Sequence, residues 1–338
     1  MSPISDRGVP RRDLLKLAGG VATAGALMGA SGCGLLGGSQ SSSQGNGRVE
    51  KSKIRVGALP ITDHAPLYLA KEQGYFQEHG LEVEIVNAAN GSAALNSMIG
   101  GDYDITYSSY VPFFQAQAKG IADLKIVADC ASAAPETNMV MSYPGSSVKE
   151  PSDLEDATIA ISAAGTISEL LTKAAMRAHG VSFDSAEFTP ISFPNMPAAL
   201  QQQRVDAAML TEPFVTLAAR GSGAVPILDV STGAAESLPL SGYGATAEFV
   251  EENPKTVAAF QRTMMKATRE AQDRSKIEPL LPKFAKIDPE TAAIVGLLDM
   301  HSKADATRLE RVPRLMREFG FLQQDVDVES MIVEPPKN

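Results

Sequence analysis

The feature that most limits the possible folds of this chain is an internal repeat. Residues 54–86 read as a short strand, a polar loop, a helix ended by a His-Gly pair, and a second strand, and residues 158–191 repeat this order. Each copy is followed by a second unit, in which a short helix, an aspartate, a strand, a polar break, a proline and another helix come in the same sequence. These shared landmarks predict two similar α/β lobes in a single chain.

The repeat also predicts how the chain is divided. Helix and strand signals alternate through its body, which favours a parallel or mixed sheet covered by helices on both faces in each lobe. A small, polar break at residues 132–137 marks the first crossover between lobes. We expect lobe 1 to comprise residues 53–137 and 244–338, and lobe 2 to comprise residues 138–243. The helices that follow Pro254 are expected to pack back onto lobe 1.

Residues 1–32 have the composition of an export signal. Arg11 and Arg12 precede an uncharged run rich in Ala and Gly, residues 17–30, which is too short to span a membrane. The paired arginines resemble a twin-arginine signal, which exports folded proteins, and an ordinary secretory signal is the alternative. Both interpretations predict a protein that works outside the cytoplasm.

Cys33 ends an Ala-Ser-Gly-Cys sequence that looks like a lipobox, in which the cysteine sulfur is lipidated and becomes the mature N-terminus. Residues 34–47 are rich in Gly, Ser and Gln and cannot bury apolar surface, so we expect residues 33–52 to form a flexible tether. One acyl chain binds a membrane only weakly, so the expected anchor has more than one. This predicts attachment to the outer face of the bacterial cytoplasmic membrane, and a soluble secreted protein is the alternative.

Composition excludes several classes of protein. Apart from Cys33 the chain has only Cys130, so it has no disulfide framework and no sulfur pair for structural zinc. The net charge is -10, and it becomes -12 without residues 1–32, which hold four basic and two acidic residues. An acidic chain without basic clusters argues against binding nucleic acid or anionic lipid.

No sequence pattern indicates an enzyme. The chain has no HExxH zinc motif, no G-x-S-x-G nucleophile elbow and no Walker loop, and no G-x-G-x-x-G follows a strand. His301 has no obvious metal-binding partner nearby in the sequence. We therefore predict a protein without catalytic residues, cofactor or metal.

The predicted binding site follows from the topology. Ligands of open α/β sheets lie beyond the C-terminal ends of the strands, where helices begin with free backbone N–H groups. Two lobes place four such loops at this edge, at residues 61–65, 108–110, 162–167 and 211–214. Their side chains are mostly hydrogen-bonding groups, as a cleft for a small ligand requires. The candidate ligand-binding residues are Asp63, His64, Ser108, Ser109, Tyr110, Thr166, Glu212 and Phe214.

Each candidate has a purely structural alternative. Asp63 and Thr166 stand where a residue caps a helix N-terminus, and Glu212 precedes a helix start at which a carboxylate is stabilised by the helix dipole. Tyr110 is also compatible with a core position. The two serines before it cannot both face a cleft while the strand continues, because neighbouring strand residues point to opposite faces. His64 lies in a loop beside an acid, where a histidine can contact a ligand.

Three segments resemble one family. PITDHAPLYLAKEQGYFQEHGLEVEIV, GDYDITYSSYVPFFQAQAKG and ALQQQRVDAAMLTEPF are similar to the solute-binding proteins of ABC importers in the nitrate, sulfonate, taurine and thiamine-precursor group. The resemblance covers residues 53–275, and A-K-E-x-G-Y-F-x-E-x-G-L is its most specific part. It implies a two-lobed periplasmic-binding fold of type II, with two crossover segments, that closes on one small molecule and delivers it to a membrane permease. We expect such a protein to be a monomer.

The resemblance leaves the ligand open. Helix N-termini near Pro66 and Thr166 could bind a sulfonate, taurine or nitrate anion without an arginine. Asp63 and Glu212 would repel such an anion, and two carboxylates with Tyr110 and Phe214 favour an amine-bearing or aromatic molecule such as an aminopyrimidine. An extracytoplasmic hydrolase and a structural envelope lipoprotein are the alternatives from other classes.

Overall fold

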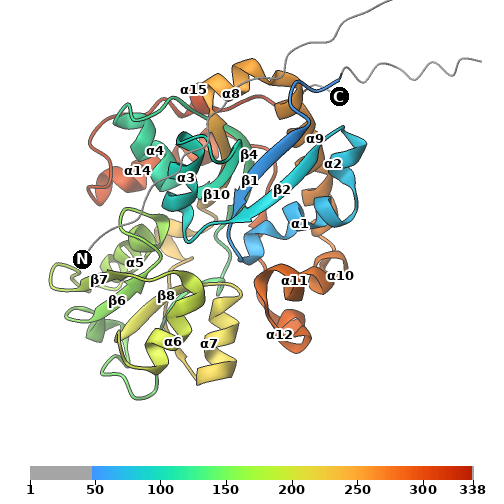
Figure 1. The fold of residues 1–338 in the computed structure, drawn as a ribbon. Helices are drawn as coiled ribbons and strands as arrows, with labels where there is room; N and C mark the ends of the chain where they lie inside the picture. The colour runs from blue at the N-terminus through green and yellow to red at the C-terminus, as the bar shows by residue number, and fades with distance from the viewer. Residues whose placement is uncertain (1–47, 337–338) are drawn as a thin grey trace, which may run out of the picture. The chain divides into compact units, whose positions relative to one another are not determined.

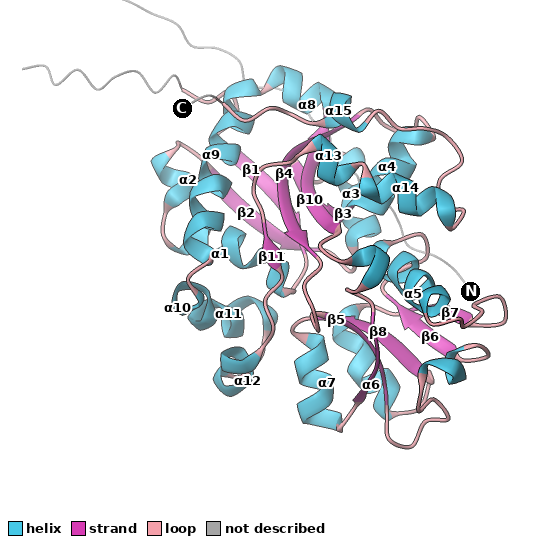
Figure 2. Cartoon of the chain, turned by 180° about the vertical axis from the view of Figure 1, so that it is seen from behind, coloured by secondary structure: helices cyan, strands magenta, loops and turns pink. Residues whose placement is uncertain are grey.

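The computed structural model describes residues 48–336, which form a compact unit of two β-sheets with helices packed around them (Figure 1). The expected export signal, the lipidation site Cys33 and most of the expected tether lie outside the described residues. Each sheet and its helices form one lobe. Figure 2 shows the two sheets from behind, with helices around each of them.

Lobe 1 is built on a six-stranded mixed sheet with the order β11-β4-β10-β3-β1-β2. Strands β1, β2 and β3 are parallel, whereas β10 runs antiparallel to both of its neighbours. The strands are β1 (Lys53–Ala58), β2 (Glu82–Asn87), β3 (Ile105–Ser109), β4 (Leu124–Ser132), β10 (Pro239–Thr246) and β11 (Asp299–Met300).

Lobe 2 is built on a five-stranded sheet with the order β7-β6-β8-β5-β9. Here β6, β7 and β8 are parallel, and β5 is antiparallel to both of its neighbours. The strands are β5 (Asn138–Ser142), β6 (Thr158–Ile161), β7 (Glu187–Pro190), β8 (Ala207–Thr211) and β9 (Val225–Asp229).

The two sheets confirm the internal repeat. The parallel strands have the same order in both lobes, β2-β1-β3 in lobe 1 and β7-β6-β8 in lobe 2. In each lobe the last of these pairs with an antiparallel strand that follows a crossover from the other lobe, β10 in lobe 1 and β5 in lobe 2. Strand β5 follows directly from β4, and β10 returns the chain from lobe 2 to lobe 1. The expected fold class, two similar α/β lobes joined by two crossover segments, is therefore confirmed.

The helices agree with the sequence in position but not always in length. The first expected helix is interrupted, because Gly74 adopts a left-handed conformation (φ 74°) between α1 and α2. In lobe 1 the first helices are α1 (Ala65–Glu72), α2 (Tyr75–Glu78), α3 (Gly91–Ile99) and α4 (Tyr110–Ala118). In lobe 2 they are α5 (Ile167–Ala178), α6 (Met196–Gln201) and α7 (Phe214–Ser222).

The C-terminal part is helical and packs onto lobe 1, as expected. Its longest helix, α9, buries Val257, Phe260 and Met264 in the core and begins at Pro254. The C-terminal helices are α8 (Ala247–Glu252), α9 (Pro254–Ala271), α10 (Arg274–Ile277), α11 (Leu281–Ala285), α12 (Pro289–Ile294), α13 (Ala306–Leu309), α14 (Arg311–Glu318) and α15 (Val328–Met331).

Two expected boundaries need adjustment. The division between lobe 2 and the second part of lobe 1, placed after residue 243, falls inside β10, all of which lies in the lobe 1 sheet. Within this strand, Gly242 allows close packing, because a Cβ there would lie 2.6 Å from the Tyr110 hydroxyl. At the other end, Glu50 and Lys51 are not part of a free tether. The Glu50 carboxylate accepts from the backbone N–H of Thr256, and Lys51 pairs with Asp104 at 2.7 Å.

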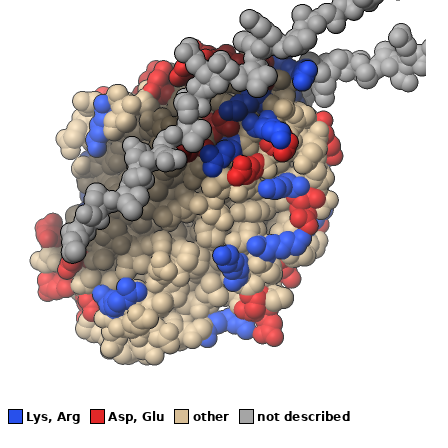
Figure 3. Space-filling view, in the orientation of Figure 1, with Lys and Arg blue, Asp and Glu red and all other residues tan. Residues whose placement is uncertain are grey.

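Charges of both signs are mixed on the surface. In Figure 3, basic and acidic side chains alternate along one side, and no broad basic area appears on the face shown. Lys53 pairs with Glu82, and Lys266 pairs with Glu78. Within residues 48–336, no helix has the length and apolar character needed to cross a membrane, and no group of three metal-ligating side chains is close enough to hold a metal ion.

Candidate functional site: a cleft between the lobes

A small cavity lies between the C-terminal ends of the strands of the two lobes. Its volume is about 40 Å³, room for a few water molecules and far below the roughly 300 Å³ at which pockets for drug-sized ligands begin. The lobes are therefore close together in this structure. Lobe 1 contributes Leu59, Ile61, Asp63, Gly91, Tyr107, Ser109 and Leu240, and lobe 2 contributes Asn138, Ser162, Thr166, Ile167, Phe193, Met209 and Thr211.

Asp63 is the only carboxylate among the residues that line the cavity. Its side chain is buried, and Oδ2 accepts hydrogen bonds from the hydroxyls of Tyr107 and Ser241, both at 3.2 Å. Oδ1 has no hydrogen-bond partner among the described residues. Burial raises the pKa of Asp63 to about 6, against the opposing effect of its donors. The helix that follows receives no side-chain cap from Asp63, so the capping alternative does not explain this residue.

His64 does not face the cavity, contrary to expectation. Its Nε2 accepts from the backbone N–H of Leu59 at 3.1 Å, so the proton is on Nδ1, which lies 2.8 Å from the hydroxyl of Tyr243. The ring also packs edge-on against Tyr107, with 4.2 Å between centroids. Burial lowers the pKa of His64 to about 3. His64 is therefore a neutral residue that supports the site from behind, with both nitrogens engaged.

The two serines at the end of β3 separate as strand alternation requires. Ser109 lines the cavity together with Tyr107, two residues earlier on the same face. Ser108 points the other way and donates to the carbonyl of Gly91 at 3.0 Å, which holds the start of α3 against the strand. Ser109 therefore lies at the cavity, and Ser108 does not line it.

Tyr110, expected to contact the ligand, is a core residue that does not line the cavity. The side chain is fully buried, and its hydroxyl donates to Asp129 at 2.6 Å. The ring lies beneath β10 at Gly242, where an added Cβ would come within 2.6 Å of the hydroxyl oxygen. A glycine is needed at this position of the strand because any side chain would overlap the ring.

Thr166 belongs to a cluster of hydroxyls at the start of α5. Its Oγ1 donates to the carbonyl of Ala163 at 2.7 Å and lies within 3.2 Å of the hydroxyls of Ser162 and Ser168. Thr166 and Ser162 both line the cavity. The side chain makes no capping hydrogen bond to α5. Lobe 2 thus presents a hydroxyl pair where the equivalent loop of lobe 1 presents Asp63.

Glu212 is close to the cavity but its carboxylate is directed away from it. Oε1 accepts from the hydroxyl of Thr216 at 2.8 Å and from the backbone N–H of Gly296 at 2.9 Å, and Oε2 accepts from the N–H of Thr216. Burial nevertheless raises the pKa of Glu212. The structure thus favours the structural alternative for Glu212, in which the carboxylate stabilises a helix, because it accepts hydrogen bonds from the first turn of α7. The neighbouring Thr211 lines the cavity instead.

Phe214 does not line the cavity but packs behind a residue that does. It stacks on Phe193 at 6.3 Å between centroids, and Phe193 is the ring that lines the cavity wall. The predicted direct contact of Phe214 with a ligand is therefore replaced by a packing role.

Sequence reasoning missed Tyr107, Asn138 and Phe193. A signal existed for two of them. Tyr107 shares the strand face of Ser109, and Phe193 follows β7, whose C-terminal end lies at the same sheet edge as the other parallel strands. Asn138 follows the crossover, and its position at the cavity depends on how β5 enters the lobe 2 sheet. Its Nδ2 donates to Thr137 and Ser231, which leaves the amide oxygen available as an acceptor.

The cleft therefore offers acceptors and hydroxyls rather than cations. No lysine or arginine is among the residues that line it, all of which lie in the described part of the chain. The free Oδ1 of Asp63 requires a donor, since an unpaired buried carboxylate oxygen is costly. Phe193 and Tyr107 supply apolar surface beside these groups.

Two lobes, two crossovers and a cavity at the facing strand ends define a type II periplasmic binding protein. The NMT1/THI5 like family model matches residues 61–276, and the chain belongs to this family. A formylaminopyrimidine-binding protein of Halalkalibacterium halodurans is 25% identical over 221 residues, which are 64% of this chain and 65% of that protein. The match thus spans slightly less than two thirds of that relative.

Solved structures show the same fold. The alkanesulfonate-binding protein SsuA from Xanthomonas axonopodis pv. citri, bound to MOPS, superimposes with a TM-score of 0.71 and 19% identity, covering 84% of this chain and 98% of that chain. The periplasmic nitrate-binding protein NrtA from Synechocystis PCC 6803 gives a TM-score of 0.72 and 15% identity, covering 84% of this chain and 86% of that chain. At these identities the likeness concerns the fold alone.

Proposed function

We propose that this protein is the solute-binding component of an ABC importer, and that it captures a small organic molecule bearing N–H donors. The observation that carries the proposal is Asp63, a buried carboxylate at the cavity with one oxygen unpartnered and no lysine or arginine beside it. Family membership and the two-lobed fold support the binding role. The protein delivers its ligand to a membrane permease and performs no catalysis.

The ligand we propose is an amine-bearing aromatic ring of the formylaminopyrimidine type. Amino groups donate to Asp63 and to the amide oxygen of Asn138, and the ring packs against Phe193. The pyrimidine-binding relative, which is 25% identical over 64% of this chain, supports this class. A cavity of about 40 Å³ cannot hold such a ring, so the lobes must separate for it to enter.

An anion of the alkanesulfonate, taurine or nitrate type is the competing ligand. The hydroxyl cluster at the N-terminus of α5 could donate to it. Asp63 opposes it, because an ionised carboxylate and an anion repel each other strongly in a site of low dielectric constant. The anion is therefore the second candidate.

The test begins with native mass spectrometry of the protein purified from its own host. A co-purified aminopyrimidine would support the proposal, and a sulfonate or nitrate would contradict the ligand class. Thermal unfolding with a metabolite panel then measures ligand-induced stabilisation, which grows with the ratio of ligand concentration to the dissociation constant. Turnover of a bound compound would indicate a hydrolase, and no stabilisation by any compound would indicate a structural envelope lipoprotein.

We further propose that the protein is exported and held as a monomer at the outer face of the cytoplasmic membrane by lipid on Cys33. The support is the sequence of residues 1–47, with its paired arginines, apolar run and Gly/Ser-rich tether. Cys33→Ser should move the protein from the membrane fraction to the soluble fraction, and retention after a salt wash would contradict the anchor. Arg11 and Arg12 changed to Lys should block export if the twin-arginine route is used.

A further inference from the structure

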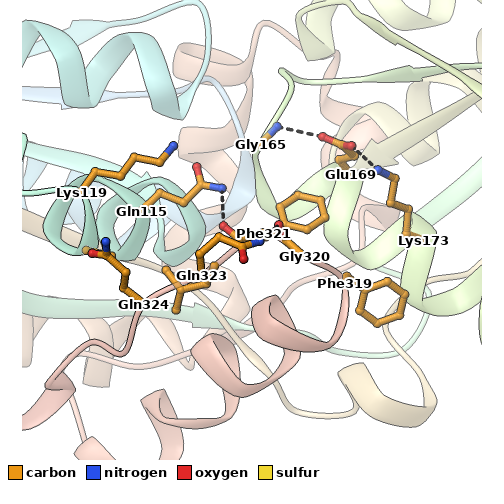
Figure 4. A pocket seen from close by; sticks show the side chains of 12 residues that line it. Gln115, Lys119, Gly165, Glu169, Lys173, Phe319, Gly320, Phe321, Gln323 and Gln324 are labelled. Carbon is orange, nitrogen blue, oxygen red and sulfur yellow. Dashed lines mark hydrogen bonds and ion pairs between the residues drawn. The ribbon is translucent and has the colours of Figure 1, made fainter.

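A group of contacts outside the cavity joins lobe 2 to the C-terminal segment of lobe 1. It surrounds an open hollow of about 540 Å³ between α4, α5 and the chain after α14 (Figure 4). On the lobe 2 side, Lys173 and Arg177 project from α5. On the lobe 1 side, Glu318 is the last residue of α14, and Phe319 and Phe321 lie in the chain directly after it. We call these five residues the C-terminal latch.

The latch combines charge and aromatic contacts. Arg177 pairs with Glu318 at 2.9 Å, and its guanidinium lies 3.7 Å from the ring centroid of Phe319. The ammonium of Lys173 lies 5.3 Å from the ring centroid of Phe321. The surface ion pair alone contributes little, but two cation–π contacts add to it, one from Arg177 itself and one from Lys173.

The latch is connected at both ends to rigid parts of the molecule. On the lobe 1 side, Gln115 of α4 donates to the carbonyl of Phe321 at 3.0 Å. On the lobe 2 side, Lys173 pairs with Glu169 at 2.5 Å, and Glu169 accepts from the backbone N–H of Gly165 at 2.8 Å. Gly165 directly precedes Thr166, which lines the cavity. Figure 4 shows this series of side chains running from Gln115 to Lys173.

We propose that the C-terminal latch sets the affinity for the ligand by stabilising the closed arrangement of the lobes, without touching the ligand. Its residues are absent from the cavity lining, yet they join the two lobes beside it. The cavity of this closed form, about 40 Å³, is too small for the proposed ring, so the ligand binds a form with the lobes further apart, and its apparent affinity is proportional to the population of that form. Weakening the latch raises the population of this more open form and leaves the cavity groups unchanged. The effect on affinity rests on the proposed binding function, whereas the effect on closure does not.

Closure can be measured without any ligand. The backbone N–H of Thr62 donates to the carbonyl of Glu212 across the lobes at 3.2 Å, so its exchange with deuterium reports separation of the lobes. In the full chain, Arg177→Ala and Phe319→Ala should each speed exchange of the peptide containing Thr62 by roughly three- to thirty-fold. Arg317→Ala is the matched control, because Arg317 lies on the same helix and pairs with Asp325 instead.

The charge-swapped pair Arg177→Glu with Glu318→Arg should restore much of the protection lost in Arg177→Ala. Exchange at Thr62 that is equal in Arg177→Ala and in the Arg317→Ala control would overturn the latch. With formylaminopyrimidine as the probe, the dissociation constant should fall by the same factor by which exchange becomes faster, because both follow the population of the more open form. Faster exchange in a protein that does not bind this probe would refute the ligand class and leave the latch standing.

Discussion

The two faces of the cleft come from equivalent positions of a repeated fold, yet their chemistry differs. After the first strand of lobe 1 the loop places Asp63 at the cavity, and after the first strand of lobe 2 the loop places Ser162 and Thr166 there. After the third strand, lobe 1 presents Ser109, while the acid of lobe 2, Glu212, bonds to its own helix. The repeat therefore determines the backbone, and the loops determine what is recognised.

The comparison also separates two acids that look alike in sequence. Both precede a helix start, and both are buried. Glu212 receives three donors from Thr216 and Gly296, whereas Asp63 keeps one oxygen without a partner. Glu212 therefore stabilises the fold, whereas Asp63 has an oxygen available for a ligand. Substitutions at these two positions should move stability and affinity in different directions.

The largest expected effect is on ligand-free stability. The pKa of Asp63 is about 6 in the folded protein against an ordinary 3.8, so between these pH values the folded state binds more protons and stability falls as pH rises. Asp63→Asn removes this loss. It should raise the free energy of unfolding by about 3 kcal/mol at pH 7.5 and by about 1 kcal/mol at pH 4.5. Urea unfolding at both pH values measures the difference, and an equal effect at both would show that Asp63 is not raised in pKa.

His64 should change the free energy of unfolding with pH in the opposite direction to Asp63. Its pKa is about 3 in the fold against an ordinary 6.5, so the folded state binds fewer protons and stability falls as pH drops below 6.5. The two slopes oppose each other in the wild type between about pH 4 and pH 6. In Asp63→Asn the loss of stability on acidification should therefore be steeper than in the wild type. Equal curves for the two proteins would contradict the raised pKa of Asp63, and no loss of stability in Asp63→Asn below pH 6.5 would contradict a neutral, buried His64.

Ligand affinity should distinguish the two acids next. Asp63→Asn should weaken binding of an N–H-bearing ligand by about 1.5–3 kcal/mol, because a charge-assisted hydrogen bond is lost. Glu212→Ala should leave affinity nearly unchanged and lower the free energy of unfolding by about 1–3 kcal/mol, since buried donors of Thr216 and Gly296 lose their acceptor. Calorimetry and urea unfolding of both variants test this. A large loss of affinity in Glu212→Ala with unchanged stability would reverse the assignment.

A smaller effect is expected at Tyr107, which donates to Asp63 at 3.2 Å. Tyr107→Phe keeps the ring against His64 but removes the hydroxyl, so affinity should fall by about 0.5–1.5 kcal/mol. Tyr110→Phe is the control, because it removes a hydroxyl bonded to Asp129 away from the cavity. Calorimetry should show weaker binding only in Tyr107→Phe, and equal losses in the two variants would argue against a specific role at the cleft.

Much of this could be predicted from the sequence because periodic patterns determine strands and helices. The repeat was enough to predict two sheets with equivalent strand order and the four loops at their facing edges. Which loop residue faces the cleft was harder. Asp63, Ser109 and Thr166 reach the cavity, but His64, Ser108, Tyr110 and Phe214 pack inside their own lobes.

The reason for these misses is that local sequence gives the position of a residue but not the partners supplied from far along the chain. Glu212 is bonded by Gly296, and Tyr110 fits only because Gly242 lies above it. The same holds for the latch, where Phe321 meets Lys173 across the two lobes. Such pairs are determined by tertiary packing, which no period of a single segment reveals.

The most direct test of the account is the pH dependence of ligand affinity. Calorimetry with formylaminopyrimidine, from pH 7.5 to pH 5, should show affinity falling in the wild type as pH drops through about 6, where Asp63 takes up a proton. The same titration of Asp63→Asn corrects for protonation of the ligand and should lack this fall. Affinity that is independent of Asp63 protonation, or tighter binding of nitrate or an alkanesulfonate than of formylaminopyrimidine at pH 7.5, would contradict an acceptor site built around Asp63.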